Sequence, residues 1–371
     1  MRLLILTCNT GEGHNSASGA IEELVLASGG TCEKVDALAF LSKAVSKAVC
    51  AVHVKLYRSS SMTKVWKKSY AKLDANSQEA SDSPSFATRL LSSGAIRLRK
   101  YLKENDFDAI LSTHPFSGVM LTKALEKQPL DVPCVFVCTD YTCGPMVPDQ
   151  KLPFVCIPHK DLVDLFVTSG VQADTLFTTG IPVRHVFREK NSREDARRAL
   201  DVPADCFNAV LMCGSMGCGP MADLAEEFAS RLPEGGLLTV CCGTNKKLLS
   251  ELNKKNLKNV RALGFTRDVP LWMDSADIFI TKPGGLSITE AVNRGVPLLL
   301  MNVVGGCETP NFHLFLKNGY AEGVEDPAEA PALFSELVSS PERRAAMVEK
   351  QKTDFAEDAA EKIWNILQGK H

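Results

Sequence analysis

The sequence lacks the features that would place the chain across a membrane or outside the cell. No stretch approaches the about 18 consecutive apolar residues that a membrane-spanning helix needs. The first residues, Met1–Thr7, form a strand pattern followed at once by glycines, without the apolar core and small-residue cleavage site of a signal peptide. We therefore expect a cytoplasmic protein.

The sequence also lacks the cysteine spacing of a zinc site and a strong charge of either sign. None of its 13 cysteines forms a paired CxxC…CxxC pattern. Several, such as Cys134 and Cys213, lie in apolar strand patterns, where a thiol acts as a small hydrophobe. We expect reduced, mostly structural thiols. A formal net charge of −2 argues against polyanion binding by the molecule as a whole.

Strand and helix patterns alternate in two successive arrays along the 371 residues, with a break at Gly180–Arg184. Two such arrays predict an α/β protein with two Rossmann-like, doubly wound domains facing a central cleft. We place the first domain at residues 1–185 and the second at residues 186–340. C-terminal helices in residues 341–371 are expected to pack back on the first domain. Ligands of such sheets bind at the carboxyl ends of the strands.

Two glycine-rich stretches follow predicted strands and open helices. In Cys8–Ser16, Gly11 and Gly13 allow close backbone approach, and His14 is placed to act as a general base on an alcohol. The alternative for His14 is a residue that caps the helix. Leu211–Pro220 is the counterpart in the second domain, either a backbone cradle for a pyrophosphate or a tight turn.

The third stretch is Thr281–Glu290, in which Pro283-Gly-Gly turns the chain from a strand into a helix. The N–H groups of the first helical turn can hold a phosphate, and Glu290 can accept both hydroxyls of a ribose. The alternative for Glu290 is a solvated helix residue. Further along, Glu308 and Asn311 are candidates for contacts with sugar hydroxyls, or they belong to an ordinary polar loop.

A basic segment occupies residues 41–72, and no acidic residue lies between Asp36 and Asp74. Its apolar residues recur at helical spacing, and aromatic residues are interleaved, as in helices that lie on anionic lipid. The alternative is an apolar stripe that packs on the domain beneath solvated lysines. The candidate membrane residues are Lys43, Lys47, Lys55, Arg58, Lys64, Trp66, Lys67 and Lys68. Nucleic-acid binding is the weaker interpretation, because no nucleic-acid-binding module surrounds the segment.

Eight motifs follow one another along the chain: GEGHNSAS (11–18), STHPF (112–116), TDYT (139–142), GIPV (180–183), MGCG (216–219), CGTN (242–245), TKPGGLSITEA (281–291) and GGCE (305–308). Taken in order, they resemble the family of monogalactosyldiacylglycerol synthases and processive diacylglycerol glucosyltransferases, which is related to the peptidoglycan N-acetylglucosaminyltransferase. The resemblance implies a GT-B fold, a UDP-sugar donor bound by the second domain, and inverting transfer without a metal or another cofactor.

The resemblance also implies roles for single residues. His14 resembles the proposed base of the family. The implied donor-binding residues are Gly13, Met216, Gly217, Phe265, Gly284, Gly285, Ser287, Glu290, Glu308 and Asn311, and the acceptor side would include His114, Asp140 and Tyr141. The sequence departs from the family at Gly11-Glu-Gly13 and at Cys143-Gly-Pro145, where plant-type enzymes place a histidine. The second departure concerns the acceptor and leaves the donor site unchanged.

We therefore predict an enzyme that transfers glucose or galactose from a UDP-sugar to diacylglycerol or a glycosyl-diacylglycerol at the inner face of the membrane. Two alternatives remain. One is a UDP-N-acetylglucosamine-type transferase or 2-epimerase that takes another acceptor or none. The other is a non-catalytic UDP-sugar sensor.

Overall fold

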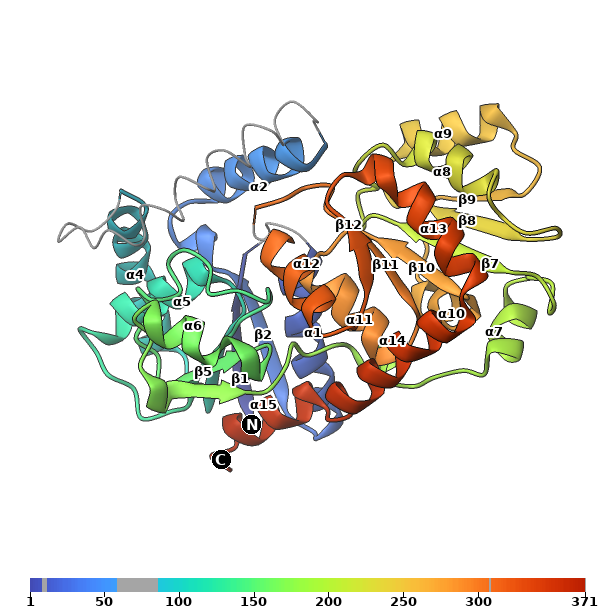
Figure 1. Cartoon of the computed structure of the whole chain (residues 1–371). Helices are drawn as coiled ribbons and strands as arrows, with labels where there is room; N and C mark the ends of the chain where they lie inside the picture. Colours follow the sequence, from blue (N-terminus) through green and yellow to red (C-terminus); the bar gives the residue numbers. More distant parts are fainter. Residues whose placement is uncertain (9–11, 59–85, 307, 371) are drawn as a thin grey trace. The chain divides into compact units, whose positions relative to one another are not determined.

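The computed structural model describes residues 1–8, 12–58, 86–306 and 308–370. The chain forms two compact units (Figure 1). The first contains the described residues up to Leu56, residues 86–184 and the C-terminal segment from Asp358. His185–Glu357 forms the body of the second.

The first unit is built on a parallel sheet with the strand order β2-β1-β3-β4-β5-β6. Leu4 of β1 pairs with Glu33 on one side and Ile110 on the other, so β1 lies inside the sheet. Residues 3–6 have no exposed surface, as expected for a strand covered on both faces. In chain order the strands and helices are β1 Arg2–Thr7, α1 Glu12–Ala27, β2 Thr31–Asp36, α2 Lys43–Arg58, α4 Phe86–Glu104, β3 Ala109–Ser112, α5 Pro115–Leu125, β4 Cys134–Val137, β5 Phe154–Ile157, α6 Val163–Thr168 and β6 Leu176–Thr178.

The second unit has a parallel sheet with the strand order β12-β11-β10-β7-β8-β9. Its elements are α7 Arg193–Ala199, β7 Asn208–Met212, α8 Met221–Ala229, β8 Leu237–Cys241, α9 Lys246–Lys255, β9 Val260–Leu263, α10 Val269–Ser275, β10 Ile278–Thr281, α11 Gly285–Arg294, β11 Leu298–Met301, α12 Glu308–Lys317, β12 Glu322–Val324, α13 Ala330–Ser339 and α14 Pro341–Asp354.

The strand orders fix where each unit can bind a ligand. In the second unit the chain runs outward from β7 through β8 to β9 and returns to β10, which pairs with β7. The order reverses between β7 and β10, and ligands of open α/β sheets bind at the carboxyl ends of the strands at such a point. The loop after β7 and the turn after β10 therefore meet at the favoured position. In the first unit the same reversal lies between β1 and β3.

The C-terminal helices divide between the two units, which corrects the expectation that residues 341–371 pack together on the first domain. Helix α14 packs against α11 and α13 of the second unit, and Gln351 donates hydrogen bonds to the carbonyls of Val296 and Tyr320. Helix α15, Ala359–Leu367, packs on α1, and its apolar face joins the core of the first unit (Figure 1). The chain thus returns to the first unit only at its last helix.

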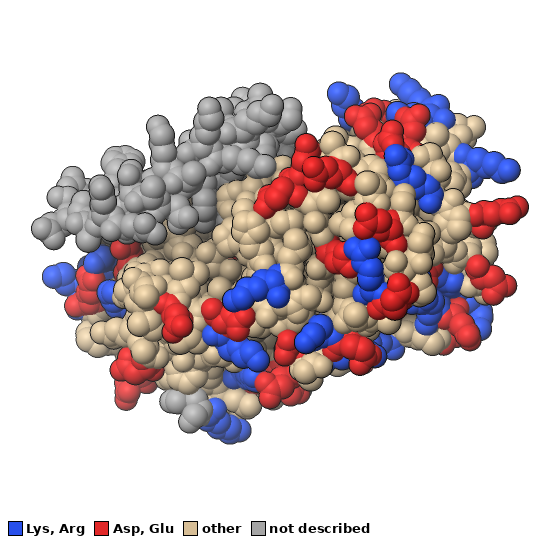
Figure 2. All heavy atoms as spheres, in the orientation of Figure 1, with Lys and Arg blue, Asp and Glu red and all other residues tan. Residues whose placement is uncertain are grey.

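On the face drawn in Figure 2, Lys and Arg lie among Asp and Glu over the described residues, between larger areas of other residues. None of the described helices is long and apolar enough to cross a bilayer. Both findings agree with the small net charge and the short apolar runs of the sequence.

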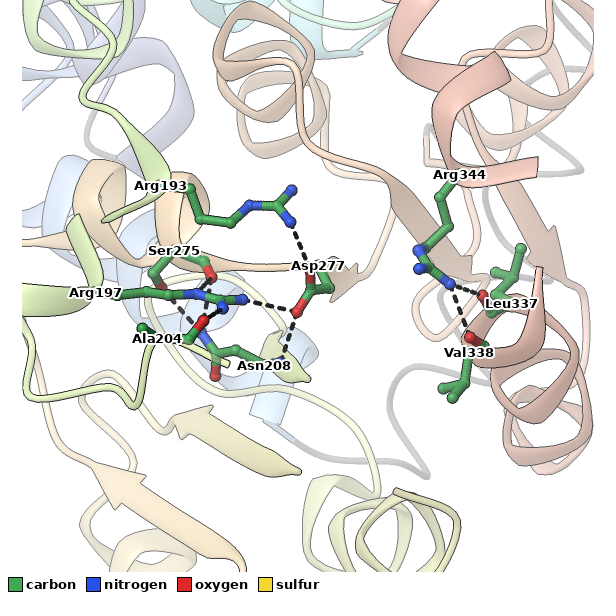
Figure 3. Close-up of polar contacts among 9 residues, drawn as sticks. All are labelled: Arg193, Arg197, Ala204, Asn208, Ser275, Asp277, Leu337, Val338 and Arg344. Atoms are coloured by element: carbon green, nitrogen blue, oxygen red, sulfur yellow. Dashed lines mark hydrogen bonds and ion pairs between the residues drawn. The ribbon is translucent and has the colours of Figure 1, made fainter. Parts of the chain in front are cut away.

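A buried polar network fixes α7 to the amino ends of β7 and β10 (Figure 3). Asp277 accepts hydrogen bonds from Arg193, Arg197 and the backbone N–H of Asn208 at 2.7–2.8 Å. Arg197, only 5% exposed, also donates to the carbonyls of Ser275 and Ala204. Because this network lies at the end of the sheet opposite the glycine loops, its contribution is to stability rather than to ligand binding.

Candidate functional site

Two glycine loops of the second unit meet directly after β7 and β8. Gly217 has a φ of +56°, and a Cβ there would lie 2.5 Å from the carbonyl oxygen of Cys242. Gly243 has a φ of +57°, and a Cβ there would lie 2.1 Å from the carbonyl oxygen of Ser215. Only glycine fits at either position. The loops are also joined by hydrogen bonds from Asn245 Nδ2 to the Gly217 carbonyl, at 3.0 Å, and from the Thr244 N–H to the Ser215 carbonyl, at 2.9 Å. The backbone of this paired loop is therefore held in one geometry, with Met216 half-buried within it.

The turn after β10 presents the N-terminus of α11. Gly284 is the N-cap residue and offers no side-chain cap, so N–H groups of the first turn, including those of Gly285 and Ser287, are placed for an anion. Gly284 and Ser287 are half-buried. Glu290, on the second turn of the helix, is 9% exposed. That position argues against the alternative of a solvated helix residue.

The carboxyl end of β10 also carries a buried ion pair that no sequence motif predicts. Lys282 Nζ donates to Glu308 Oε1, and the two residues are 8% and 3% exposed. Glu308, which the resemblance assigns to the sugar, is thus the partner of a lysine. Asn311 has no exposed surface, and its amide donates to the Pro283 carbonyl at 3.0 Å, so its side chain holds the turn.

Phe265 follows β9 and is 65% exposed, the largest value among the large hydrophobic residues that the structure describes as exposed. An exposed ring at the carboxyl end of a strand is suited to stacking on a flat heterocycle. This geometry fits the position beside a uracil that the resemblance implies.

In the first unit, His14 lies near the start of α1 and contacts the ends of β3 and β4. Its Nδ1 lies 2.7 Å from the Thr113 carbonyl oxygen and 2.8 Å from Thr139 Oγ1. A carbonyl can only accept, so Nδ1 carries the proton in the neutral ring, and Nε2 keeps its lone pair. In this tautomer Nε2 can accept a proton as a general base. Gly13, which precedes it, is half-buried at the start of α1.

The acceptor-side candidates occupy different environments. His114 caps α5, where its Nδ1 accepts from the Phe116 N–H at 3.1 Å, and its ring lies edge-on to His14 with a centroid separation of 4.5 Å. Asp140 is half-buried. Tyr141 is only 1% exposed and lies in the core.

The basic segment is described only in part. Lys43 and Lys47 are exposed on α2, whereas Val45 and Val49 of the same helix are half-buried. Lys55 and Arg58 belong to α2, but the structure describes only their backbone. The other candidates, Lys64, Trp66, Lys67 and Lys68, lie outside the described residues altogether.

The twelve described cysteines are all free thiols. Burial raises the pKa of Cys213 to about 12 and raises that of Cys138 further. A thiol with so high a pKa stays protonated and unreactive at neutral pH. Within residues 1–8, 12–58, 86–306 and 308–370, no group of three His, Cys, Asp or Glu side chains is placed to hold a metal ion.

Family models match most of both units. The model for monogalactosyldiacylglycerol (MGDG) synthase matches residues 14–183, and the model for glycosyl transferases group 1 matches residues 223–354. The "Processive diacylglycerol beta-glucosyltransferase" of Staphylococcus saprophyticus is 28% identical over 262 residues, which is 69% of this chain. The match spans 66% of that relative, just under two thirds of its length.

Two solved structures share the fold over nearly the full chain. MurG from Acinetobacter baumannii has a TM-score of 0.62 and 13% identity, and it covers 99% of this chain and 99% of its own. The UDP-GlcNAc 2-epimerase from Neisseria meningitidis, bound to UDP-GlcNAc, has a TM-score of 0.63 and 10% identity, with full coverage of both chains. The motif-based resemblance is confirmed: the first unit matches the monogalactosyldiacylglycerol synthase model, the second matches the group 1 glycosyl transferase model, and the fold is GT-B.

Proposed function

We propose that the protein transfers a hexose from a UDP-sugar to diacylglycerol or a glycosyl-diacylglycerol, with inversion and without a metal. The observation that carries the proposal is the environment of His14, whose Nδ1 donates to the Thr113 carbonyl, so that Nε2 carries the basic lone pair. The two glycosyltransferase domains and the name of the staphylococcal relative support the reaction class and the lipid acceptor.

In the proposed step, the acceptor hydroxyl attacks the anomeric carbon of the sugar and gives its proton to His14 Nε2. The bond between the anomeric carbon and the diphosphate oxygen breaks, and UDP leaves on the opposite face. The backbone N–H groups of the paired loop at Gly217 and Gly243 and those at the start of α11 stabilise the charge that develops on the diphosphate. Glu290 holds the ribose hydroxyls and Phe265 packs against the uracil.

Replacing His14 tests the base. His14→Ala is expected to lower turnover by about 100- to 10,000-fold, the usual contribution of a general base. UDP binding, measured by titration calorimetry, is expected to stay close to that of the wild type, because His14 belongs to the first unit. Unchanged turnover would remove His14 from the mechanism.

Replacing Glu290 tests the donor site separately. Glu290→Ala removes a buried carboxylate and is expected to weaken UDP binding by about 10-fold or more, the equivalent of about 1.4 kcal/mol. The same variant should bind inorganic diphosphate as the wild type does, because the ribose contact is the one removed. Equal UDP affinity in both proteins would contradict the ribose assignment.

We also propose that α2 docks on anionic lipid. Each basic side chain near such a surface contributes about 1 kcal/mol, and Lys43 and Lys47 are exposed on this helix. The double variant Lys43→Glu/Lys47→Glu should sediment less with vesicles that contain phosphatidylglycerol. Lys246→Glu/Lys247→Glu makes the same charge change at exposed positions of α9 and serves as the control. Equal losses for the two variants would show a general charge effect instead of a docking helix.

A further inference from the structure

The buried ion pair between Lys282 and Glu308 lies where the diphosphate of the donor is proposed to bind. Lys282 directly follows β10, and its ammonium lies beside two glycines. A Cβ at Gly284 would come within 2.9 Å of Lys282 Nζ, and a Cβ at Gly214 would come within 3.1 Å of Lys282 Cε. The lysine therefore fills the space between the loop after β7 and the turn that starts α11.

The charge of this lysine is maintained in spite of its burial. Burial by itself lowers the pKa of Lys282, but the Glu308 carboxylate more than offsets that effect, so the pKa is raised and the side chain is an ammonium at neutral pH. The neighbouring Cys213 thiol is neutral because burial raises its pKa to about 12. The turn thus holds a fixed positive charge next to helix N–H groups.

Glu308 has a second feature that points to a ligand. Its Oε2 is fully buried and, among the described residues, receives no hydrogen bond. A buried carboxylate oxygen without a donor is costly unless another group supplies one. Buried ion pairs in general contribute little net stability, so an ion pair with an unsatisfied oxygen is poorly explained by folding alone.

We propose that Lys282 is the cation that binds the diphosphate of a nucleoside diphosphate, and that Glu308 is the positioning residue that holds its ammonium between the two glycine loops. An ammonium has three N–H donors and can bind more than one acceptor. The inference rests on the proposed function, and it adds a charged side chain to a site otherwise built from backbone N–H groups. It also gives Glu308 a role through Lys282, in addition to the sugar contact that the resemblance implies.

The test compares ligands that differ only in phosphate. Titration calorimetry with UDP, UMP and uridine measures how much affinity each phosphate adds. Lys282→Met alone would leave the Glu308 carboxylate buried without its partner and could unfold the second unit. The informative variant is therefore Lys282→Met/Glu308→Gln, which removes both charges together, with thermal unfolding to establish that it folds.

In this double variant, UDP affinity is expected to fall by about 10- to 100-fold, as for loss of a charge-assisted hydrogen bond, while uridine affinity stays the same. Glu308→Gln alone keeps the ammonium and is expected to keep a preference for UDP over uridine. Lys317→Met, at an exposed position at the end of α12, is the matched control and should leave all three affinities unchanged.

The outcomes separate the inference from the proposed function. If the wild type binds UDP and the folded double variant keeps the full preference for UDP over uridine, Lys282 is not the phosphate-binding cation and the proposed function still stands. If the wild type binds none of the three ligands, the donor site and this inference fail together. If uridine affinity falls as much as UDP affinity, the pair only supports the fold of the site.

Discussion

The substitution Gly217→Ala, in the paired glycine loop after β7, allows a quantitative prediction of stability and UDP affinity. An alanine in the left-handed backbone conformation costs about 1–2 kcal/mol. At this position the new Cβ would also lie 2.5 Å from the Cys242 carbonyl oxygen and 3.2 Å from Asn245 Cβ. The loops must separate to relieve these clashes. Their separation breaks the hydrogen bond from Asn245 Nδ2 to the Gly217 carbonyl, which costs about 1 kcal/mol more.

Gly235 provides the matched control. Its φ of +76° is also left-handed, but a Cβ there would meet nothing within 4 Å. Gly235→Ala should therefore show only the conformational cost of about 1–2 kcal/mol. The expected loss for Gly217→Ala is about 2–3 kcal/mol in urea unfolding, together with at least a 10-fold loss of UDP affinity.

The comparison of the two variants is decisive for the role of the loop. Gly235→Ala should bind UDP as the wild type does, because it leaves the loop unchanged. If both variants lose the same stability and both bind UDP normally, the contact between the loops at residues 217 and 242 does not shape the donor site. That result would falsify the assignment of this loop to the diphosphate.

Two further predictions follow from single contacts, and a third follows from the proposed metal-independent transfer. Thr139→Val removes the hydroxyl 2.8 Å from His14 Nδ1 and should lower kcat several-fold with KM for the UDP-sugar unchanged, whereas Thr139→Ser should restore kcat. Arg197→Met removes the buried guanidinium that pairs with the Asp277 carboxylate and should destabilise the protein by about 3 kcal/mol without changing UDP affinity. Arg198→Met, at an exposed position, should do neither. EDTA should leave turnover unchanged, and restoration of lost activity by Mg²⁺ or Mn²⁺ would contradict metal-independent transfer.

The buried strands could be predicted from the sequence because short apolar runs, covered on both faces, leave a local pattern. Leu237–Cys241 and Ile278–Thr281 are apolar runs of this kind, and both are strands. The edge strand Glu322–Val324 leaves no such pattern, since all three of its residues are only half-buried and the run is short. The pattern therefore marks the centre of a sheet more reliably than its edge.

The glycine loops were also predictable, whereas the contacts that complete the site were not. Lys282 pairs with a residue 26 positions away, and Thr139 contacts His14 across 125 positions. Such pairs depend on which strand ends meet at the point where the strand order of each sheet reverses. The division of the C-terminal helices between the two units could not be predicted either. The apolar face of an amphipathic helix does not indicate which of two cores it joins.

The most direct test of the central claim is a transfer assay. The purified chain is incubated with diacylglycerol in phosphatidylglycerol vesicles and with UDP-glucose, UDP-galactose and UDP-N-acetylglucosamine in turn, and lipids and nucleotides are analysed by mass spectrometry. We predict a lipid product heavier by one or more hexoses, together with one UDP released for each hexose transferred, in the presence of EDTA. Isomerisation of the sugar nucleotide without a lipid product, or UDP-sugar binding without turnover, would contradict the account.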